Sequence, residues 1–203
     1  MNSSRKPELL IFDLGGVFYT LDYERKWSRI RQACGRSYDE IRDILYDDAF
    51  IDLEIGRISP FDYFSAVSQK LGCSMLFDDF KEIFNSFLVK REEMFSLLSV
   101  LLSKVRIHLL SNTNAINAEV LKKDFEGLQA GTTFSFETGY RKPDPEIFRI
   151  ALLREGASAG RTLFVDDFEE NVRAACEEGF RAHLFTGKTG LLHFLECEGV
   201  GIR

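Results

Sequence analysis

The sequence predicts an α/β protein with a doubly wound, Rossmann-like parallel sheet and an inserted all-helical cap. Two observations lead to this fold class. Short apolar runs alternate with stretches of helical periodicity, the pattern of βαβ units in a parallel sheet. From about residue 23 to about residue 91, however, only helical patterns occur. We therefore expect a core of residues 1–20 and 92–203 and a helical cap of residues 21–91.

The strands of the core are predicted from short apolar runs. Leu9–Phe12 is apolar at every position, as expected of a strand that is buried on both faces. Similar runs are found at Ile107–Leu110, Thr162–Val165 and Ala182–Phe185, with a weaker candidate at Thr133–Phe136. Helical periodicity separates them at Met94–Lys104, Ala115–Lys123, Pro145–Glu155 and Glu169–Glu178.

The cap region contains clear helix signals. Ser59 followed by Pro60 predicts the start of a helix, and Gly72 predicts its end. Four aromatic residues further along are expected to form the core of the cap rather than ligand contacts, on ordinary burial preferences. They are Phe77, Phe80, Phe84 and Phe87.

Composition narrows the classes of partner. The net charge of −6 argues against binding to nucleic acid or to an anionic membrane, but not against a small phosphate ester. The N-terminal segment has the pattern of neither a signal peptide nor a membrane span. The four cysteines, which are too scattered for a zinc site, are expected to be buried or idle thiols in a cytoplasmic protein. They are Cys34, Cys73, Cys176 and Cys197.

Four polar clusters carry the candidate chemistry. Asp13-Leu14-Gly15-Gly16, Ser111-Asn112-Thr113-Asn114 and Asp166-Asp167 each follow a predicted strand, and Arg141-Lys142-Pro143 precedes a helix. Ligands of open α/β sheets bind at the carboxyl ends of the strands. Each cluster alone is also explained by helix capping, but the four together predict one active site.

The motifs in this order resemble those of the haloacid dehalogenase-like (HAD) hydrolase superfamily. The first motif, Ile11-Phe12-Asp13-Leu14-Gly15-Gly16-Val17, is similar to that of small capped phosphatases with the pattern D-L-G-[GN]-V. The resemblance extends through Leu110–Asn114, Gly139–Pro143 and Phe164–Asp167, with Asn171 behind them. The cap string Glu54–Ser59 looks like that of bacterial glucose-1-phosphate and other sugar-phosphate phosphatases.

The resemblance implies a phosphoric monoester hydrolase that uses Mg²⁺. Asp13 is then the nucleophile that forms an aspartyl-phosphate. The metal ligands are expected to be the Asp13 carboxylate, the Gly15 carbonyl and Asp166, because Mg²⁺ prefers oxygen donors. Asp167 is expected to orient the metal waters or nearby backbone.

The remaining motif residues are expected to hold the phosphate. Ser111 donates its hydroxyl and Asn112 its backbone N–H to phosphate oxygens. Lys142 is expected to neutralise both Asp13 and the transferring phosphoryl group. Thr113 and Asn114 fit helix caps.

Gly15 departs from the family pattern, which usually has a second aspartate two residues after the nucleophile. General acid–base help, typically worth about 10²–10⁴-fold, is therefore missing. We expect a preference for leaving groups that need little protonation, such as anomeric sugar, acyl or aryl phosphates. Asp22 and Tyr23 are candidates for a relocated acid, although both also fit the start of the first cap helix.

Other residues are less informative. Glu54 and Arg57 fit a sugar contact and a surface turn equally well. The three histidines are expected to be structural, because two lie in strand runs and one in a C-terminal helix. They are His108, His183 and His193.

Three other functions are open at this point. A 2-haloacid dehalogenase shares the nucleophile, the serine and the lysine, but it needs no metal, so the Asp166-Asp167 pair would harm it. A phosphoacceptor receiver has its acidic pair and phosphoacceptor in the reverse order along the chain. A catalytically weak phosphate-binding or regulatory HAD-like protein is suggested by Gly15. The prediction is an Mg²⁺-dependent phosphatase of small metabolites, sugar phosphates above all; no oligomeric state is predicted.

Overall fold

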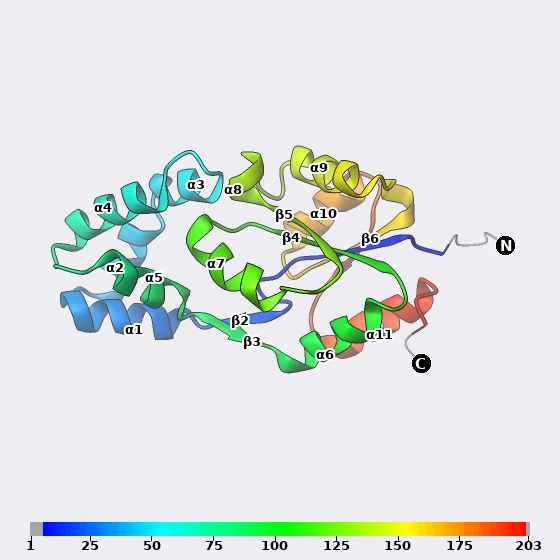
Figure 1. Cartoon of the computed structure of the whole chain (residues 1–203), viewed down its shortest axis with the longest axis horizontal. Helices are drawn as coiled ribbons and strands as arrows, with labels where there is room; N and C mark the ends of the chain where they lie inside the picture. Colours follow the sequence, from blue (N-terminus) through cyan, green and yellow to red (C-terminus); the bar gives the residue numbers. More distant parts are fainter. Residues whose placement is uncertain (1–5, 202–203) are drawn as a thin grey trace.

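The computed structural model describes residues 6–201, and its centre is a five-stranded sheet (Figure 1). The strand order is β5-β4-β1-β6-β7, and every neighbouring pair is parallel. The strands are β1 (Leu9–Phe12), β4 (Arg106–Ser111), β5 (Ala130–Phe134), β6 (Thr162–Asp166) and β7 (Arg181–Leu184). The predicted doubly wound parallel sheet is therefore confirmed. Because β1 lies between β4 and β6, the strand order reverses at β1, where ligands of such sheets bind.

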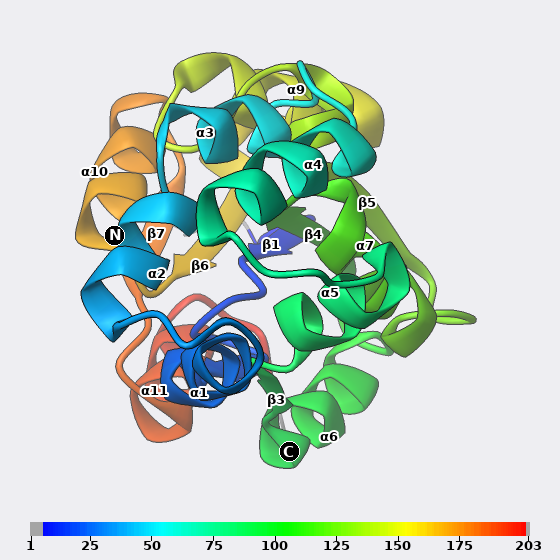
Figure 2. The same ribbon diagram turned by 90° about the vertical axis from the view of Figure 1, so that its left-hand side faces the viewer.

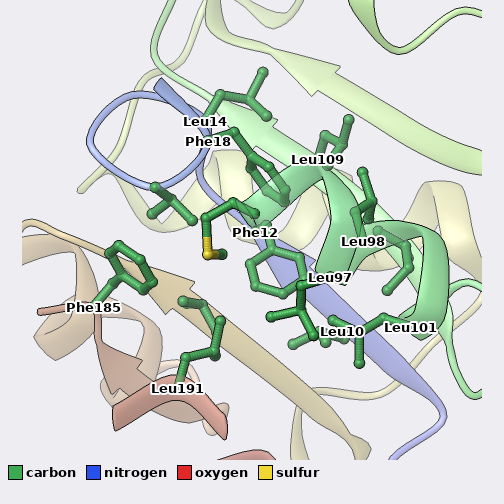
Figure 3. Packing of buried hydrophobic residues seen from close by; sticks show 14 of the residues in the cluster. Leu10, Phe12, Leu14, Phe18, Leu97, Leu98, Leu101, Leu109, Phe185 and Leu191 are labelled. Carbon is green, nitrogen blue, oxygen red and sulfur yellow. The ribbon is translucent and has the colours of Figure 1, made fainter. Parts of the chain in front are cut away.

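Helices cover both faces of this sheet. They are α6 (Glu92–Leu101), α7 (Ala115–Asp124), α8 (Ser135–Thr138), α9 (Pro145–Glu155), α10 (Glu169–Glu177) and α11 (Lys188–Cys197), with a 3₁₀ turn at Ala159–Arg161. On one face Leu10 and Phe12 of β1 pack in a cluster with residues of α6 and α11 (Figure 3). On the other face Leu9 and Ile11 pack in a cluster with residues of α9 and α10. Since successive side chains of a strand point to opposite faces, this two-sided burial explains why β1 is apolar throughout.

Five further helices form a second body, called the cap below. They are α1 (Tyr23–Cys34), α2 (Tyr38–Leu45), α3 (Asp48–Glu54), α4 (Pro60–Leu71) and α5 (Phe77–Asn85). They pack in a second hydrophobic cluster, built around residues such as Ile30, Tyr63 and Phe80, which Ile116 of α7 joins from the core. Viewed end-on, the cap helices lie in front of the ends of β1, β4 and β6 (Figure 2). The division at residues 21 and 91 stays a prediction, but the cap clearly faces the carboxyl ends of the strands.

The chain enters and leaves the cap through a small antiparallel ribbon. Its strands are β2 (Tyr19–Leu21) and β3 (Leu88–Lys90), with Thr20 opposite Val89. The expectation that the region 23–91 contains only helices is therefore wrong at its C-terminal end. Three-residue strands are too short to produce a periodic pattern, so the sequence carried little signal for them.

The predicted helix ends are largely as expected. Ser59 accepts the Asp62 N–H at the start of α4, and Gly72 ends that helix in the left-handed conformation. Asn114 caps α7, as predicted. Thr113 does not cap that helix; instead its N–H donates to Ser135 Oγ at 2.9 Å. Asp22 caps α1 by accepting the Arg25 N–H at 3.0 Å.

The expectation of buried or idle thiols is wrong for Cys34 and Cys73, which are bonded to each other, while for Cys176 and Cys197 it is wrong only as to burial. Cys34 at the end of α1 and Cys73 after α4 form a disulfide within the cap. Cys176 and Cys197 are free but exposed. A separation of 39 residues between the bonded cysteines gives no local pattern from which the bond could be read. The cytoplasmic location stays a prediction.

Membrane spans are absent from the helices of residues 6–201, since none is both long enough and apolar enough to cross a bilayer.

Candidate active site

The polar clusters predicted from the sequence meet at one end of the sheet. A cavity of about 300 Å³ lies between this end of the core and the cap. Its lining includes Asp13 and Gly15 after β1, Ser111 and Asn112 at the end of β4, and Lys142. Asp166, at the end of β6, is fully buried behind Lys142. The predicted site residues are therefore brought together.

Lys142 joins three strands at the base of the cavity. Its ammonium donates to Asp13 Oδ1 at 2.5 Å, to Asp166 Oδ2 at 2.6 Å and to the Leu110 carbonyl at 3.0 Å. Only 2% of Lys142 is exposed. Because all three acceptors belong to different strands, the lysine fixes the relative position of the two carboxylates.

Asn112 holds Lys142 in place. The Asn112 side chain accepts the Lys142 N–H at 2.7 Å and donates to the Lys142 carbonyl at 2.8 Å. This paired contact fixes the backbone of the Arg141-Lys142-Pro143 loop. The prediction for Asn112 concerned only its backbone N–H, so this side-chain role is an addition to it. A reciprocal amide contact over 30 residues leaves no local sequence signal.

Negative charge is in excess around Asp13. Burial raises the pKa of Asp13 to about 7, with Lys142 acting to lower it and Asp166 and Asp167 adding to the rise. Burial alone would lower the pKa of Lys142, but the carboxylates of Asp13 and Asp166 outweigh that effect and raise it. Three carboxylates thus share one ammonium, and a buried arrangement of this kind favours a bound cation.

The donor set fits a divalent metal ion. One carboxylate oxygen each of Asp13, Asp166 and Asp167 lies within 4.8 Å of the others. Asp167 Oδ1 is buried without a hydrogen-bond partner, as an unfilled ligand position would be. Asp166 is oriented from behind by the Asn171 amide, which donates to both of its oxygens at 3.0 and 3.1 Å. Hard oxygen donors in this number suit Mg²⁺.

Gly16 is required by this cluster. Its φ of +70° is in the left-handed region, where glycine is favoured. A Cβ atom at this position would overlap the carboxylate of Asp167. The second glycine of the first motif therefore makes room for an acidic side chain from the end of β6.

Two interactions connect the cap to the core near the cavity. Arg141 forms an ion pair with Glu54 at 3.1 Å, and Asn117 of α7 donates to Asn85 of α5 at 2.7 Å. Glu54 is 7% exposed, so the surface-turn interpretation is wrong for it. Burial raises the pKa of Glu54, against the opposing effect of Arg141. Arg57, by contrast, pairs with Asp52 on the surface and does not line the cavity.

Aromatic side chains form the cap side of the cavity. Phe84 packs in the hydrophobic cluster of the cap, as predicted, whereas Phe87 is buried outside that cluster; both also line the cavity. Tyr23, a candidate acid, lines the cavity as well, and burial raises its pKa. Asp22 does not line it, and its capping contact agrees with the simpler interpretation as a helix start.

Lys26 is a cavity residue that the sequence analysis missed. It lies in α1 with only 1% of its surface exposed, and burial lowers its pKa to about 7. A signal was available: Tyr23, Lys26 and Ile30 are spaced i, i+3 and i+7 on one helical face, which the apolar residues mark as the buried face. A lysine on that face is unusual.

The histidines lie away from the cavity, and their structural role stays a prediction. His108 is buried between Glu155 and Thr133, at 2.8 and 2.9 Å. His183 stacks on Phe194, and burial lowers its pKa. His193 lies 3.7 Å from Cys197 Sγ near the C-terminus. None of the three lines the cavity.

Comparison with known proteins agrees with this geometry. The model of the haloacid dehalogenase-like hydrolases matches residues 7–177. The chain belongs to this family. It is 29% identical to the sesquiterpene phosphatase astK of Aspergillus oryzae over 174 residues, which cover 81% of this chain and 83% of the relative. It is 25% identical to a D-ribitol-5-phosphate phosphatase of Bacteroides thetaiotaomicron over 182 residues, which cover 84% of this chain and 88% of the relative.

A solved structure of an HAD family enzyme from Bacteroides thetaiotaomicron, in complex with magnesium and inorganic phosphate, has the same fold. Its TM-score is 0.81 at 28% identity, and the match covers 90% of this chain and 96% of that chain. The phosphatase prediction is therefore supported at the level of the family.

The overlap at Gly16 gives a first prediction. Gly16→Ala is expected to lower the free energy of unfolding by more than the roughly 1–2 kcal/mol of a left-handed alanine, and to weaken Mg²⁺ binding, because Asp167 must move. Gly139→Ala is the matched control, since Gly139 also has a positive φ but open space around it. Denaturant unfolding and Mg²⁺ titration measure both effects. Equal effects of the two substitutions would contradict the crowding argument.

The burial of Lys26 gives a second prediction. The pKa of about 7 in the folded state lies below the ordinary lysine value of 10.5, so the unfolded state binds more protons between these pH values and stability rises with pH. Lys26→Met removes the cost of burying a protonated amine. It is expected to raise the free energy of unfolding by at least about 1 kcal/mol near pH 6.5. The gain should shrink toward pH 10. Denaturant unfolding at several pH values measures it; a gain independent of pH would contradict the burial argument.

Proposed function

We propose that this HAD-family chain is a magnesium-dependent phosphoric monoester hydrolase that acts through an aspartyl-phosphate on Asp13. The observation that carries the proposal is the contact of the Lys142 ammonium with both Asp13 and Asp166, next to a third carboxylate at the base of a cavity. The phosphatases among the relatives and the magnesium and phosphate bound to the solved HAD enzyme support it.

Asp13, the Gly15 carbonyl and Asp166 would hold Mg²⁺, with Asp167 beside them. When bound, the ion supplies positive charge that offsets the repulsion between the Asp13 carboxylate and an anionic phosphate ester. The orphaned Asp167 oxygen supports a cation at this place. The substrate is then a small phosphorylated metabolite that binds in the cavity. Sugar phosphates, including anomeric ones, are the predicted substrates.

The residues of the chain divide the reaction between them. A carboxylate oxygen of Asp13 attacks phosphorus, the ester P–O bond breaks, and its electron pair leaves with the ester oxygen. Ser111 and the Asn112 N–H donate to the phosphoryl oxygens, while Lys142 keeps Asp13 charged and oriented. The departing oxygen takes up a proton from solvent. Water then attacks the phosphorus of the aspartyl-phosphate and gives up a proton to solvent, which releases inorganic phosphate and restores the Asp13 carboxylate.

The dehalogenase alternative is disfavoured by charge. A nucleophilic carboxylate without a metal has no use for two more carboxylates within 4.8 Å, because they oppose its ionised form. A regulatory phosphate-binding protein is suggested only by Gly15. The intact contacts of Asp13, Lys142 and Asp166 favour a working enzyme over that alternative.

Substitution of the nucleophile tests the proposal. Asp13→Asn is expected to lower Mg²⁺-dependent phosphate release from glucose-1-phosphate or phenyl phosphate by at least about 10³-fold. Asp78→Asn, at an exposed cap residue outside the cavity, is the matched control and should change little. Hydrolysis that survives Asp13→Asn or removal of Mg²⁺ would contradict the mechanism. Metal-independent chloride release from a 2-haloacid would reverse the choice in favour of the dehalogenase.

The missing acid gives a further prediction. A Cβ at Gly15 would lie 3.4 Å from Leu21 and 3.9 Å from Asp13 Oδ2, which are ordinary van der Waals contacts. Gly15→Asp is therefore expected to raise turnover of simple alkyl phosphates by about 10²-fold relative to Gly15→Ala, with a smaller gain for aryl phosphates. Rates measured against leaving-group pKa test this. Parallel plots for the two variants would show that Gly15 does not limit protonation of the leaving group.

A further inference from the structure

Lys26 carries a charge that residues 6–201 do not match. Its ammonium donates to Tyr46 Oη at 2.5 Å and forms no ion pair with a described carboxylate. An ammonium has three donors, and Tyr46 accepts one of them. Lys26 nevertheless lines the cavity, so it can present a donor to whatever occupies that space.

Four aromatic rings surround this ammonium. It lies 3.9 Å from the ring centre of Phe87, 4.6 Å from Phe84, 5.0 Å from Tyr46 and 5.2 Å from Tyr23. Cation–π contacts of this kind recover part of the cost of desolvating the charge, but they do not replace an anion. Burial accordingly lowers the pKa of Lys26 to about 7. The fold therefore places at the cavity a buried amine whose charged form lacks a carboxylate among the described residues and would be stabilised by an anion.

The other cations at the cavity already have partners. Lys142 contacts Asp13 and Asp166, and Arg141 pairs with Glu54. Glu54 lines the same cavity, but it forms its ion pair with Arg141 and not with Lys26. Among the described lining residues, Lys26 is thus the buried cation without a carboxylate.

The cavity walls around Lys26 are mostly rings. Phe50, together with the four rings that surround the ammonium, gives the cap side a largely aromatic lining. A volume of about 300 Å³ is at the low end for ligand sites, so the occupant is a small molecule. Flat or ring-shaped organic groups suit such walls.

We propose that the substrate is a phosphate monoester with a second anionic group, which Lys26 binds while the organic part packs on the aromatic wall of the cap. The proposal rests on the proposed phosphatase function and names the substrate class for that site. The shared chemistry is an anion; a carboxylate and a second phosphate are its two possible sources. Lys26 is then a specificity-determining residue, since it discriminates between esters without touching the scissile bond.

Matched pairs of esters test the proposal on the wild-type protein with Mg²⁺. Phenyl phosphate carrying a carboxylate at each ring position is compared with the carboxamide of the same shape. Glucose-1-phosphate is compared with glucuronic acid 1-phosphate and with glucose 1,6-bisphosphate, which separates carboxylate from phosphate. We expect at least one anionic ester to exceed its neutral partner in kcat/KM by about 10- to 100-fold, the usual effect of a charge-assisted contact.

Lys26→Met then assigns the preference to this residue. The variant is expected to lose the advantage of the anionic ester while the neutral esters change by no more than about 3-fold, a split that general structural damage would not produce. Lys70→Met, at an exposed cap lysine outside the cavity, should keep the preference. Unfolding measurements check that the variant is folded, and the wild-type comparison stands even if it is not.

Three results would overturn the inference. If no anionic ester exceeds its neutral partner, Lys26 does not bind a second anion. If Lys26→Met lowers all esters by the same factor, the lysine acts on the scissile phosphate or on the fold. In both cases the phosphatase function survives, because the neutral esters are still hydrolysed. If no ester at all is hydrolysed with Mg²⁺, the proposed function fails and this inference fails with it.

Discussion

The buried contact between one ammonium and two carboxylates is the constraint on which the active site depends. Lys142 can hold Asp13 and Asp166 together only because parallel strands bring their carboxyl ends to the same edge of the sheet. One ammonium cannot balance three carboxylates, and the adjacent Asp167 oxygen has no partner. The fold thus holds more negative than positive charge at this place, and a hard divalent cation can neutralise the excess. In the proposed mechanism, a phosphate dianion can approach Asp13 only after that excess is offset.

The core and the cap contribute different groups to the same cavity. The core supplies charge: the proposed nucleophile Asp13, the Lys142 ammonium and the proposed metal ligands, held by buried hydrogen bonds. The cap supplies shape and a second cation, since aromatic rings and Lys26 form its wall. The Glu54–Arg141 pair and the ribbon of β2 and β3 connect the two parts. In the proposed enzyme, chemistry and substrate choice can therefore vary separately, the first through Gly15 on the core side and the second through Lys26 on the cap side.

Much of the fold and the core side of the site could be predicted from the sequence. Runs such as Leu9–Phe12 reveal buried strands by composition alone, and Asp13 or Asp166 follow at the ends where ligands bind. What the sequence could not give depends on contacts between distant segments: the Asn112 side chain on the Lys142 backbone, the disulfide in the cap and the two short strands of the ribbon. Lys26 is a different case, because its position on the apolar face of α1 could have been noticed.

The most direct test of the account is a crystal structure with Mg²⁺ and beryllium trifluoride, a mimic of a phosphoryl group bound to aspartate. We expect the fluoride group on a carboxylate oxygen of Asp13, with Ser111 and Lys142 donating to it and a cation coordinated by Asp13 and Asp166. Such a complex would show that this carboxylate accepts a phosphoryl group beside a metal. Binding of the fluoride group elsewhere, or a cation that leaves Asp13 uncoordinated, would contradict the central claim.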